Sequence, residues 1–154
     1  MSKPFLKWAG GKYTQLADLF VHIPAGKRLI EPFVGGGSVF LNSEKHADYR
    51  RTISLAGKGD VVYCDPPYEP IPGTTGFTAY AAGGFSWDNQ VDLAKQCVSA
   101  FHRGARVVIS NSSAPKVLDL YREHGFNLQF IKARRSISCK SSTREVAKDV
   151  VAIL

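Results

Sequence analysis

The period of apolar and polar positions changes several times along this chain, which predicts helices and strands in alternation. Two apolar runs, Val61-Val62-Tyr63-Cys64 and residues 106–111, have the length and β-branched content of buried strands. Residues 89–102 between them have a helical period, with Asp88 as the expected N-cap. The apolar face of this helix is expected to comprise Leu93, Ala94, Cys97, Val98 and Phe101.

The rest of the chain continues the alternation. Residues 13–22 have a helical pattern, and residues 115–124 predict a short helix that Gly125 ends. Residues 126–133 and 145–154 predict two closing strands. Strands that alternate with helices imply an α/β fold with a doubly wound, mostly parallel sheet, to which the last two strands add an antiparallel edge.

Composition narrows the class of protein. The chain has 154 residues, 44% of them hydrophobic, which suits one domain with a core of ordinary size. Twenty Lys and Arg against 13 Asp and Glu give a net charge of +7, consistent with a surface that contacts phosphates. The cysteines and histidines have no metal or redox spacing, so we expect no metal. The sequence shows no secretion signal or apolar run long enough for a bilayer, so we expect a cytoplasmic protein without a membrane partner.

The most informative segment is Asp65-Pro66-Pro67-Tyr68, directly after the predicted strand that ends at Cys64. Ligands of open α/β folds bind outside the carboxyl ends of strands, so this position suits chemistry. The prolines remove two backbone donors and leave neighbouring carbonyls able to accept hydrogen bonds. The segment suits a flat ligand with an exocyclic amino group. Asp65 and a proline carbonyl could accept the two N–H bonds of that group, while Tyr68 stacks on the face of the ligand ring. The plainer alternative is a tight turn with an incidental acid.

A second informative segment is the glycine-rich stretch 28–40, which predicts a short strand, a turn and the start of a helix. The consecutive glycines at 35–37 let the backbone approach a ligand closely. The stretch does not match a dinucleotide-binding loop, because Phe40 occupies the third glycine of G-x-G-x-x-G. Glu31, at the end of the strand, could attract a cationic ligand; a structural turn with a surface glutamate is the alternative.

A third segment, Trp8-Ala9-Gly10-Gly11-Lys12, leads into the first predicted helix. A Walker A loop is excluded, because Leu6 and Tyr13 occupy positions that need glycine and Ser or Thr. An aromatic ring, two glycines and a lysine entering a helix suit the edge of a pocket for an adenosine and a carboxylate. A packed tryptophan beside a solvated lysine is the alternative.

Taken in order, these segments resemble the Dam-type DNA adenine N6-methyltransferases, a family of Asp-Pro-Pro-Tyr amino-methyltransferases. The resemblance rests on residues 5–12, 31–42 and 61–68, with further matches at 77–80 and 134–144. It implies the Rossmann-like fold of the S-adenosylmethionine-dependent methyltransferases. It also implies methyl transfer from S-adenosylmethionine to adenine N6 in duplex DNA, within GATC, by base flipping.

The same resemblance implies roles for individual residues. The expected catalytic residues are Asp65, Pro66, Pro67 and Tyr68. The expected S-adenosylmethionine contacts are Trp8, Gly10, Lys12, Glu31, Phe33, Gly35, Gly37, Ser38 and Asp65. The expected DNA contacts are Arg134, Arg135, Ser136, Lys140 and Arg144. For this last group, a solvated basic face is the alternative.

One part of the family pattern is missing. In the family, an acid that holds the donor's ribose and then a helical target-recognition region precede the Asp-Pro-Pro-Tyr strand. Here only residues 41–59 lie between the glycine loop and that strand, too few for both. Asp48 lies too early, in too polar a context, to replace the ribose acid. We expect that the sequence joins two parts of a longer chain near Arg50 and Arg51; a true deletion variant is the alternative.

Two other functions fit part of the pattern. Methyltransferases that act on cytosine N4 or on a glutamine amide more often carry Ser or Asn at the position of Asp65, so this acid favours adenine. A catalytically inactive remnant that binds cofactor or DNA without turnover would explain the short central segment.

Overall fold

A computed structural model of the chain describes residues 16–33, 48–72, 85–132 and 148–154. Within these residues the strands are β1 (Arg28–Ile30), β2 (Asp60–Cys64), β3 (Arg106–Ser112), β4 (Asn127–Lys132) and β5 (Lys148–Ile153). The helices are α1 (Leu16–Phe20), α2 (Tyr49–Ser54), α4 (Trp87–His102) and α5 (Pro115–Glu123). The strands form one sheet in the order β1-β2-β3-β5-β4.

The sheet is mixed. Strands β1, β2 and β3 pair in parallel, and β5 is antiparallel to both of its neighbours, β3 and β4. The mostly parallel sheet and its antiparallel part are therefore confirmed, with the antiparallel strand one place in from the edge. Strand β5 carries the apolar run Val150-Val151-Ala152, which is fully buried, and burial on both faces suits an inner strand. Strand β4 is mostly exposed, as an edge strand can be.

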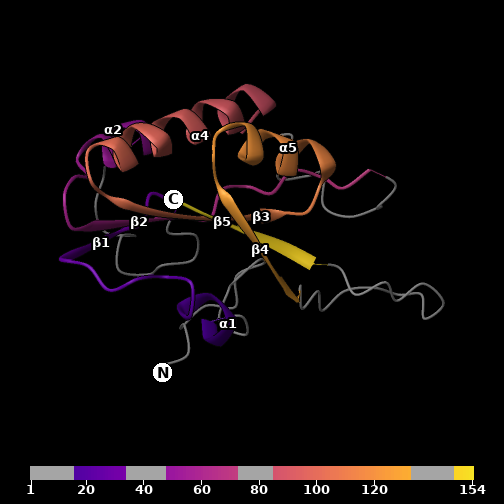
Figure 1. Ribbon diagram of the computed structural model, residues 1–154. Helices are drawn as coiled ribbons and strands as arrows, with labels where there is room; N and C mark the ends of the chain where they lie inside the picture. The colour runs from indigo at the N-terminus through magenta and orange to yellow at the C-terminus, as the bar shows by residue number, and fades with distance from the viewer. Residues whose placement is uncertain (1–15, 34–47, 73–84, 133–147) are drawn as a thin grey trace, which may run out of the picture.

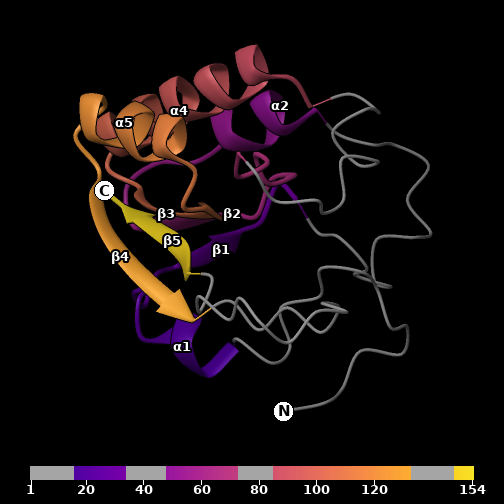
Figure 2. The ribbon, with the colours of Figure 1, turned by 90° about the vertical axis from the view of Figure 1, so that its right-hand side faces the viewer.

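Helices pack on both faces of the sheet. Helices α2, α4 and α5 cover one face and α1 lies against the other (Figure 1). Figure 2 shows the same layers after a quarter turn. Because side chains alternate along a strand, each buried strand contributes to two cores. The core under the three helices includes Val62, Cys64, Val107, Ile109, Val150, Ala152, Leu93, Cys97, Val117 and Tyr121. The smaller core on the α1 side comprises Leu19, Tyr63, Val108, Ile131 and Val151.

Helix α4 differs from the sequence prediction at both ends. Its N-cap is Ser86, whose side chain accepts a hydrogen bond from the backbone N–H of Asn89, and Asp88 lies in the first turn instead. At the other end Phe101 is 42% exposed, whereas Ala100 is fully buried. The expectation that Phe101 packs into the core is wrong, because the smaller Ala100 faces the sheet in the last turn.

The sequence does not predict helix α2, which lies in the short central segment. Asp48 is its N-cap and accepts a hydrogen bond from the backbone N–H of Arg50. Helix α5 matches its prediction closely, and Gly125 follows it with a φ of 81°, a conformation that favours glycine. Of the helix predicted over residues 13–22, the structure describes the part from Leu16 onward.

Candidate functional site

The carboxyl ends of three parallel strands bring chemically active side chains together. Ile30 pairs with Val62, so Glu31 continues the register beside Tyr63. Cys64 pairs with Ile109, so the next residues, Asp65 and Ser110, lie side by side. Glu31 and Asp65, both predicted site residues, therefore share one end of the sheet, at the position where ligands of parallel sheets bind.

The Ser110 hydroxyl contacts the Asp65 carboxylate, and the Tyr63 hydroxyl contacts Ser110 in turn. Ser110 Oγ donates to Asp65 Oδ1 at 3.0 Å, and the Tyr63 hydroxyl lies 3.1 Å from Ser110 Oγ. An ionised carboxylate only accepts, and a serine has one proton, so Tyr63 is the donor to Ser110. Burial, followed by the charge of Asp65, raises the pKa of Tyr63, which keeps its proton available. The contacts form a relay from Tyr63 through Ser110 to Asp65.

Negative charge gathers where β1 and β2 end. The pKa of Glu31 is raised, first by burial of its carboxyl group and second by the charge of Asp65. Glu31 as a whole residue is nevertheless exposed. Two carboxylates that feel each other's charge create a local negative potential. This end of the sheet therefore favours a cationic ligand.

The residues after Asp65 leave the sheet in an ordered loop. Pro66 is buried and Pro67 is exposed. The carbonyl of Pro67 accepts a hydrogen bond from Gln90 Nε2 at 2.8 Å. Burial of Tyr68, followed by the charges of Asp65 and Asp149, raises the pKa of its phenol, so the ring stays neutral at physiological pH. The motif thus has an anchored backbone and an uncharged aromatic ring.

Polar side chains from β3 and α4 contact this loop. Gln90, Asn111 and Ser112 are each at most 2% exposed, and all three contact the loop between Pro67 and Glu69. The sequence indicates only that the third strand ends in polar residues. The consecutive polar residues at 110–112, directly after an apolar run, are the feature that could have identified Asn111 and Ser112, whereas no comparable pattern marks Gln90.

A hollow with a volume of about 200 Å³ adjoins the loop. Its lining consists of Pro67, Tyr68, Glu69, Pro70, Phe85, Ser86, Trp87 and Gln90. Neither Glu31 nor Asp65 lines it, so it lies beside the carboxylates rather than over them. Lys116 contacts two of the lining residues, with Nζ 4.6 Å from the centre of the Trp87 ring and 2.6 Å from Glu69 Oε1.

Phe33 belongs to a cluster of three aromatic rings. Its ring centre lies 5.6 Å from that of Tyr49 and 5.5 Å from that of Phe85. Tyr49 and Phe85 are 5.6 Å apart. The cluster joins the end of β1 to α2 and to the residue that precedes the N-cap of α4. The predicted contact between Phe33 and a cofactor stays a prediction.

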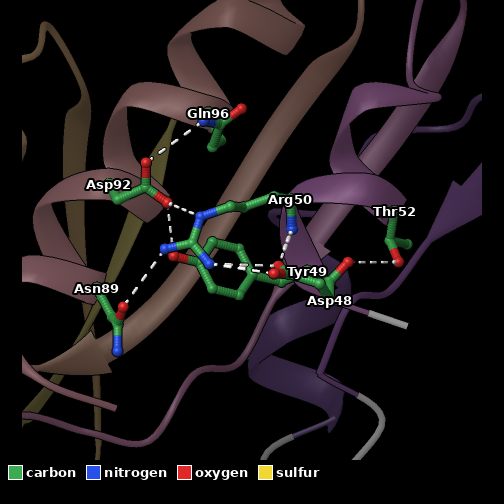
Figure 3. Close-up of polar contacts among 7 residues, drawn as sticks. All are labelled: Asp48, Tyr49, Arg50, Thr52, Asn89, Asp92 and Gln96. Carbon is green, nitrogen blue, oxygen red and sulfur yellow. Dashed lines mark hydrogen bonds and ion pairs between the residues drawn. The ribbon is translucent and has the colours of Figure 1, made fainter. Parts of the chain in front are cut away.

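A polar cluster docks α2 on α4 and orients the Tyr49 ring (Figure 3). The Tyr49 hydroxyl donates to Asp92 Oδ2 at 2.6 Å, and Arg50 Nε lies 2.7 Å from the same oxygen. Arg50 also pairs with Asp48 at 3.2 Å. The hydrogen bond from Tyr49 is the main cause of the lowered pKa of Asp92. Asp48, as an N-cap and an ion-pair partner, has a structural role at this position.

The other predicted site residues lie outside the described part of the chain. They are Trp8, Gly10, Lys12, Gly35, Gly37, Ser38, Arg134, Arg135, Ser136, Lys140 and Arg144. Among the described residues, no three His, Cys, Asp or Glu side chains are grouped as a metal site would require. No helix in the same ranges is both long and apolar enough to cross a membrane.

Comparison with known proteins identifies relatives. The family model for D12 class N6 adenine-specific DNA methyltransferases matches residues 8–54 and 44–137, which together make up more than half of the chain. The two matched stretches meet around α2, in the short central segment.

Three curated relatives share this similarity. The DNA N-6-adenine-methyltransferase of Escherichia phage P1 is 29% identical over 266 positions, covering 99% of this chain and 35% of the phage protein. The DNA adenine methylase of Vibrio cholerae is 25% identical, covering 98% of this chain and 95% of the relative. The DNA adenine methylase of Escherichia coli is 24% identical, covering 99% of this chain and 95% of the relative. These alignments span 266 positions against 154 residues here, so the relatives contain residues without a counterpart.

Proposed function

The chain belongs to the family of D12 class N6 adenine-specific DNA methyltransferases, and we propose that it transfers a methyl group from S-adenosylmethionine to adenine N6 in duplex DNA. The observation that carries this proposal is the position of Asp65 at the end of β2, beside Glu31 and Ser110 and before two prolines. An exocyclic amino group needs hydrogen-bond acceptors, and a carboxylate with an adjacent proline carbonyl supplies them.

Orientation of the amino group is the central task of these residues. The lone pair of adenine N6 is delocalised into the ring, so the nitrogen is a poor nucleophile. Hydrogen bonds from N6 to Asp65 and to the Pro66 carbonyl favour a pyramidal nitrogen whose lone pair points at the methyl group. The proton can leave after transfer, so no strong base is required. The relay from Tyr63 and Ser110 restricts the Asp65 carboxylate, and such positioning supplies much of the rate.

Adenine N6 is paired inside a duplex, so the base must leave the stack to reach Asp65. Tyr68 is proposed to stack on the flipped ring, a contact worth about 1–3 kcal/mol per base. Tyr68 directly follows the two prolines and lines the hollow beside the loop, which is the position that this role requires.

The charge of the site fits a sulfonium donor. The charge of Asp65 opposes the ionisation of Glu31, and a nearby positive sulfur would favour the charged form of Glu31. S-adenosylmethionine supplies an activated methyl group when bound. Glu31 and Phe33 are proposed to hold it together with Trp8, Gly10, Lys12, Gly35, Gly37 and Ser38. The proposed fold is the Rossmann-like one of this methyltransferase class.

DNA binding is proposed to use the basic segment around residues 134–144, in line with the net charge of +7. A target-recognition region between Arg50 and Arg51 remains part of the proposal, with GATC as the site. Intact-mass measurement of the natural protein tests this region. A mass above 16.9 kDa, together with a peptide that carries extra residues between Arg50 and Arg51, supports additional chain at the junction, whereas a peptide that runs directly through Arg50 and Arg51 means that α2 is continuous.

The reaction is tested with tritiated S-adenosylmethionine and unmethylated duplex DNA. Asp65→Ala is the test variant, and Asp119→Ala, whose side chain is 66% exposed, is the matched control. Label in DNA that requires both Asp65 and GATC supports the proposal. Absence of label from a protein that still binds the cofactor would overturn it in favour of a binding remnant.

A further inference from the structure

We propose that Gln90 and Asn111 are positioning residues for methyl transfer, because they set the orientation of the proline carbonyls that follow Asp65. This inference rests on the proposed function of the Asp65 site. It concerns the helix side of the sheet, whereas the relay that holds Asp65 lies on the α1 side. Ser110 and Asn111 are consecutive in β3, so their side chains point to opposite faces and reach the motif from both sides.

The loop itself offers few means of anchoring its backbone. Residues 65–71 form no helix or strand, and three of them, Pro66, Pro67 and Pro70, are prolines that cannot donate a hydrogen bond. Anchoring therefore depends on groups from other elements that reach the carbonyls, or on the backbone N–H groups that follow the prolines.

Three side-chain contacts supply this anchoring. Gln90 Nε2 donates to the Pro67 carbonyl at 2.8 Å. Asn111 Oδ1 accepts from the backbone N–H of Glu69 at 3.2 Å. Ser112 Oγ donates to the carbonyl of Glu69 at 2.6 Å. The loop is thus held at both ends of a three-residue stretch, from α4 on one side and β3 on the other.

The orientation of both amides follows from their neighbours. Asn111 Oδ1 accepts two backbone N–H groups, those of Glu69 and Ser112, so its Nδ2 must be the donor on the other side. Asn111 Nδ2 donates to Gln90 Oε1 and to the Tyr121 hydroxyl, each at 3.1 Å. Because Gln90 Oε1 accepts, Gln90 presents its NH₂ group to Pro67. The backbone of β3 therefore sets the orientation of the Asn111 amide, which sets that of Gln90, which in turn donates to the loop.

Burying this network costs desolvation free energy that an apolar core would not cost. Gln90 is 2% exposed and Asn111 is fully buried, and a buried amide is rarely tolerated without partners. Apolar residues would pack the same space with no requirement for complementary donors and acceptors. The position imposed on the loop is what distinguishes this network from apolar packing.

Anchoring Pro67 also restricts the carbonyl of Pro66. The peptide group between the prolines is planar, and the ring of Pro67 locks its φ. With the Pro67 carbonyl held by Gln90, only the ψ angle of Pro67 separates the anchored carbonyl from that of Pro66. The Pro66 carbonyl is the proposed second acceptor for adenine N6, so Gln90 acts on the reaction through the backbone.

The test compares Gln90→Met and Gln90→Glu with wild type in single-turnover methyl transfer, beside cofactor binding and thermal melting. Gln129→Glu, on the exposed face of β4, is the matched control. We expect Gln90→Met to lower the transfer rate roughly tenfold, as expected for a misplaced acceptor. Cofactor affinity should change by less than about threefold, because Gln90 does not contact the Glu31 side of the site.

Gln90→Glu adds a readout that a purely structural role would not change. A protonated glutamic acid can donate to Pro67 and accept from Asn111, whereas the ionised form cannot donate. Its transfer rate should therefore fall, relative to wild type, as pH rises through the pKa of the new acid, which burial raises. Tyr121 does not titrate in this range, because burial raises its pKa. The pair of Glu69 and Lys116 is present in both proteins, so its effect cancels in the ratio.

The outcomes separate this inference from the proposed function. An active wild type with an unchanged transfer rate in Gln90→Met, or a pH profile in Gln90→Glu parallel to wild type, would overturn the positioning role alone. If Gln90→Met does not fold, the pH profile of the nearly isosteric Gln90→Glu decides. A folded wild type that transfers no methyl group would overturn the proposed function and this inference with it.

Discussion

Removing the hydroxyl of Ser110 should slow methyl transfer more than it weakens substrate binding. Ser110 is fully buried and donates to Asp65 Oδ1 at 3.0 Å. Ser110→Ala removes this donor without adding bulk, so the Asp65 carboxylate gains freedom to rotate away from the amino group. The Tyr63 hydroxyl, 3.1 Å from Ser110 Oγ, loses its acceptor at the same time.

The magnitude follows from the kind of hydrogen bond lost. A hydrogen bond to a charged group contributes about 1.5–3 kcal/mol, and loss of that energy from the transition state slows transfer roughly 10- to 100-fold. A buried hydroxyl without a partner costs about 1–3 kcal/mol of folding free energy. Tyr63→Phe added to Ser110→Ala should restore much of that stability but not the rate, because Asp65 still lacks its donor.

The assay is single-turnover methyl transfer at saturating cofactor and DNA, with unfolding free energies from chemical denaturation. Ser99→Ala, the same change on an exposed position of α4, is the control. A Ser110→Ala protein with reduced stability but a wild-type transfer rate would refute the reasoning, since Asp65 would then need no orienting partner.

Further predictions concern charge. The hydrogen bond from Arg28 is the main cause of a pKa of about 2 for Asp60, so Asp60→Asn should lower the melting temperature at pH 7. Since a lowered pKa stabilises the fold only above it, that difference should disappear between about pH 4 and pH 2 in melts followed by circular dichroism. Asp92→Asn weakens the hydrogen bond with Tyr49 and should reduce the unfolding free energy at neutral pH by about 0.2–1 kcal/mol in denaturant titrations, the range of partly exposed pairs. Glu31→Gln should raise the dissociation constant of S-adenosylmethionine roughly tenfold in calorimetry, because it removes a charge near the sulfonium; an unchanged constant would contradict the electrostatic role.

Much of the fold follows from local patterns. The apolar runs that become β2 and β3, and the helical period of α4, depend on burial of contiguous residues, which the sequence shows directly. The inner position of β5 depends on long-range pairing, which no local pattern specifies. The N-cap of α4 is Ser86 rather than the predicted Asp88, because both residue types can cap a helix and only the backbone geometry shows which one does.

The sequence likewise predicts one part of the candidate site and not the rest. Asp65 stands out because a strand, an acid and two prolines are consecutive in the chain. Its partner Ser110 is 45 residues away, and the contact exists because Cys64 pairs with Ile109 rather than with a neighbour. The bond from Gln90 to Pro67 likewise spans 23 residues and depends on how α4 packs on the sheet. Short-range patterns therefore identify the candidate site residue Asp65, and strand register and helix packing determine which side chains contact its segment.

The central claim is that the Asp65 site methylates adenine N6, and the most direct measurement is nucleoside mass spectrometry of duplex DNA containing GATC after incubation with protein and S-adenosylmethionine. The account predicts N6-methyladenine from the wild-type protein and from Asp119→Ala, and none from Asp65→Ala. Equal amounts of N6-methyladenine from wild type and Asp65→Ala, or none from a wild-type protein that binds the cofactor, would contradict it.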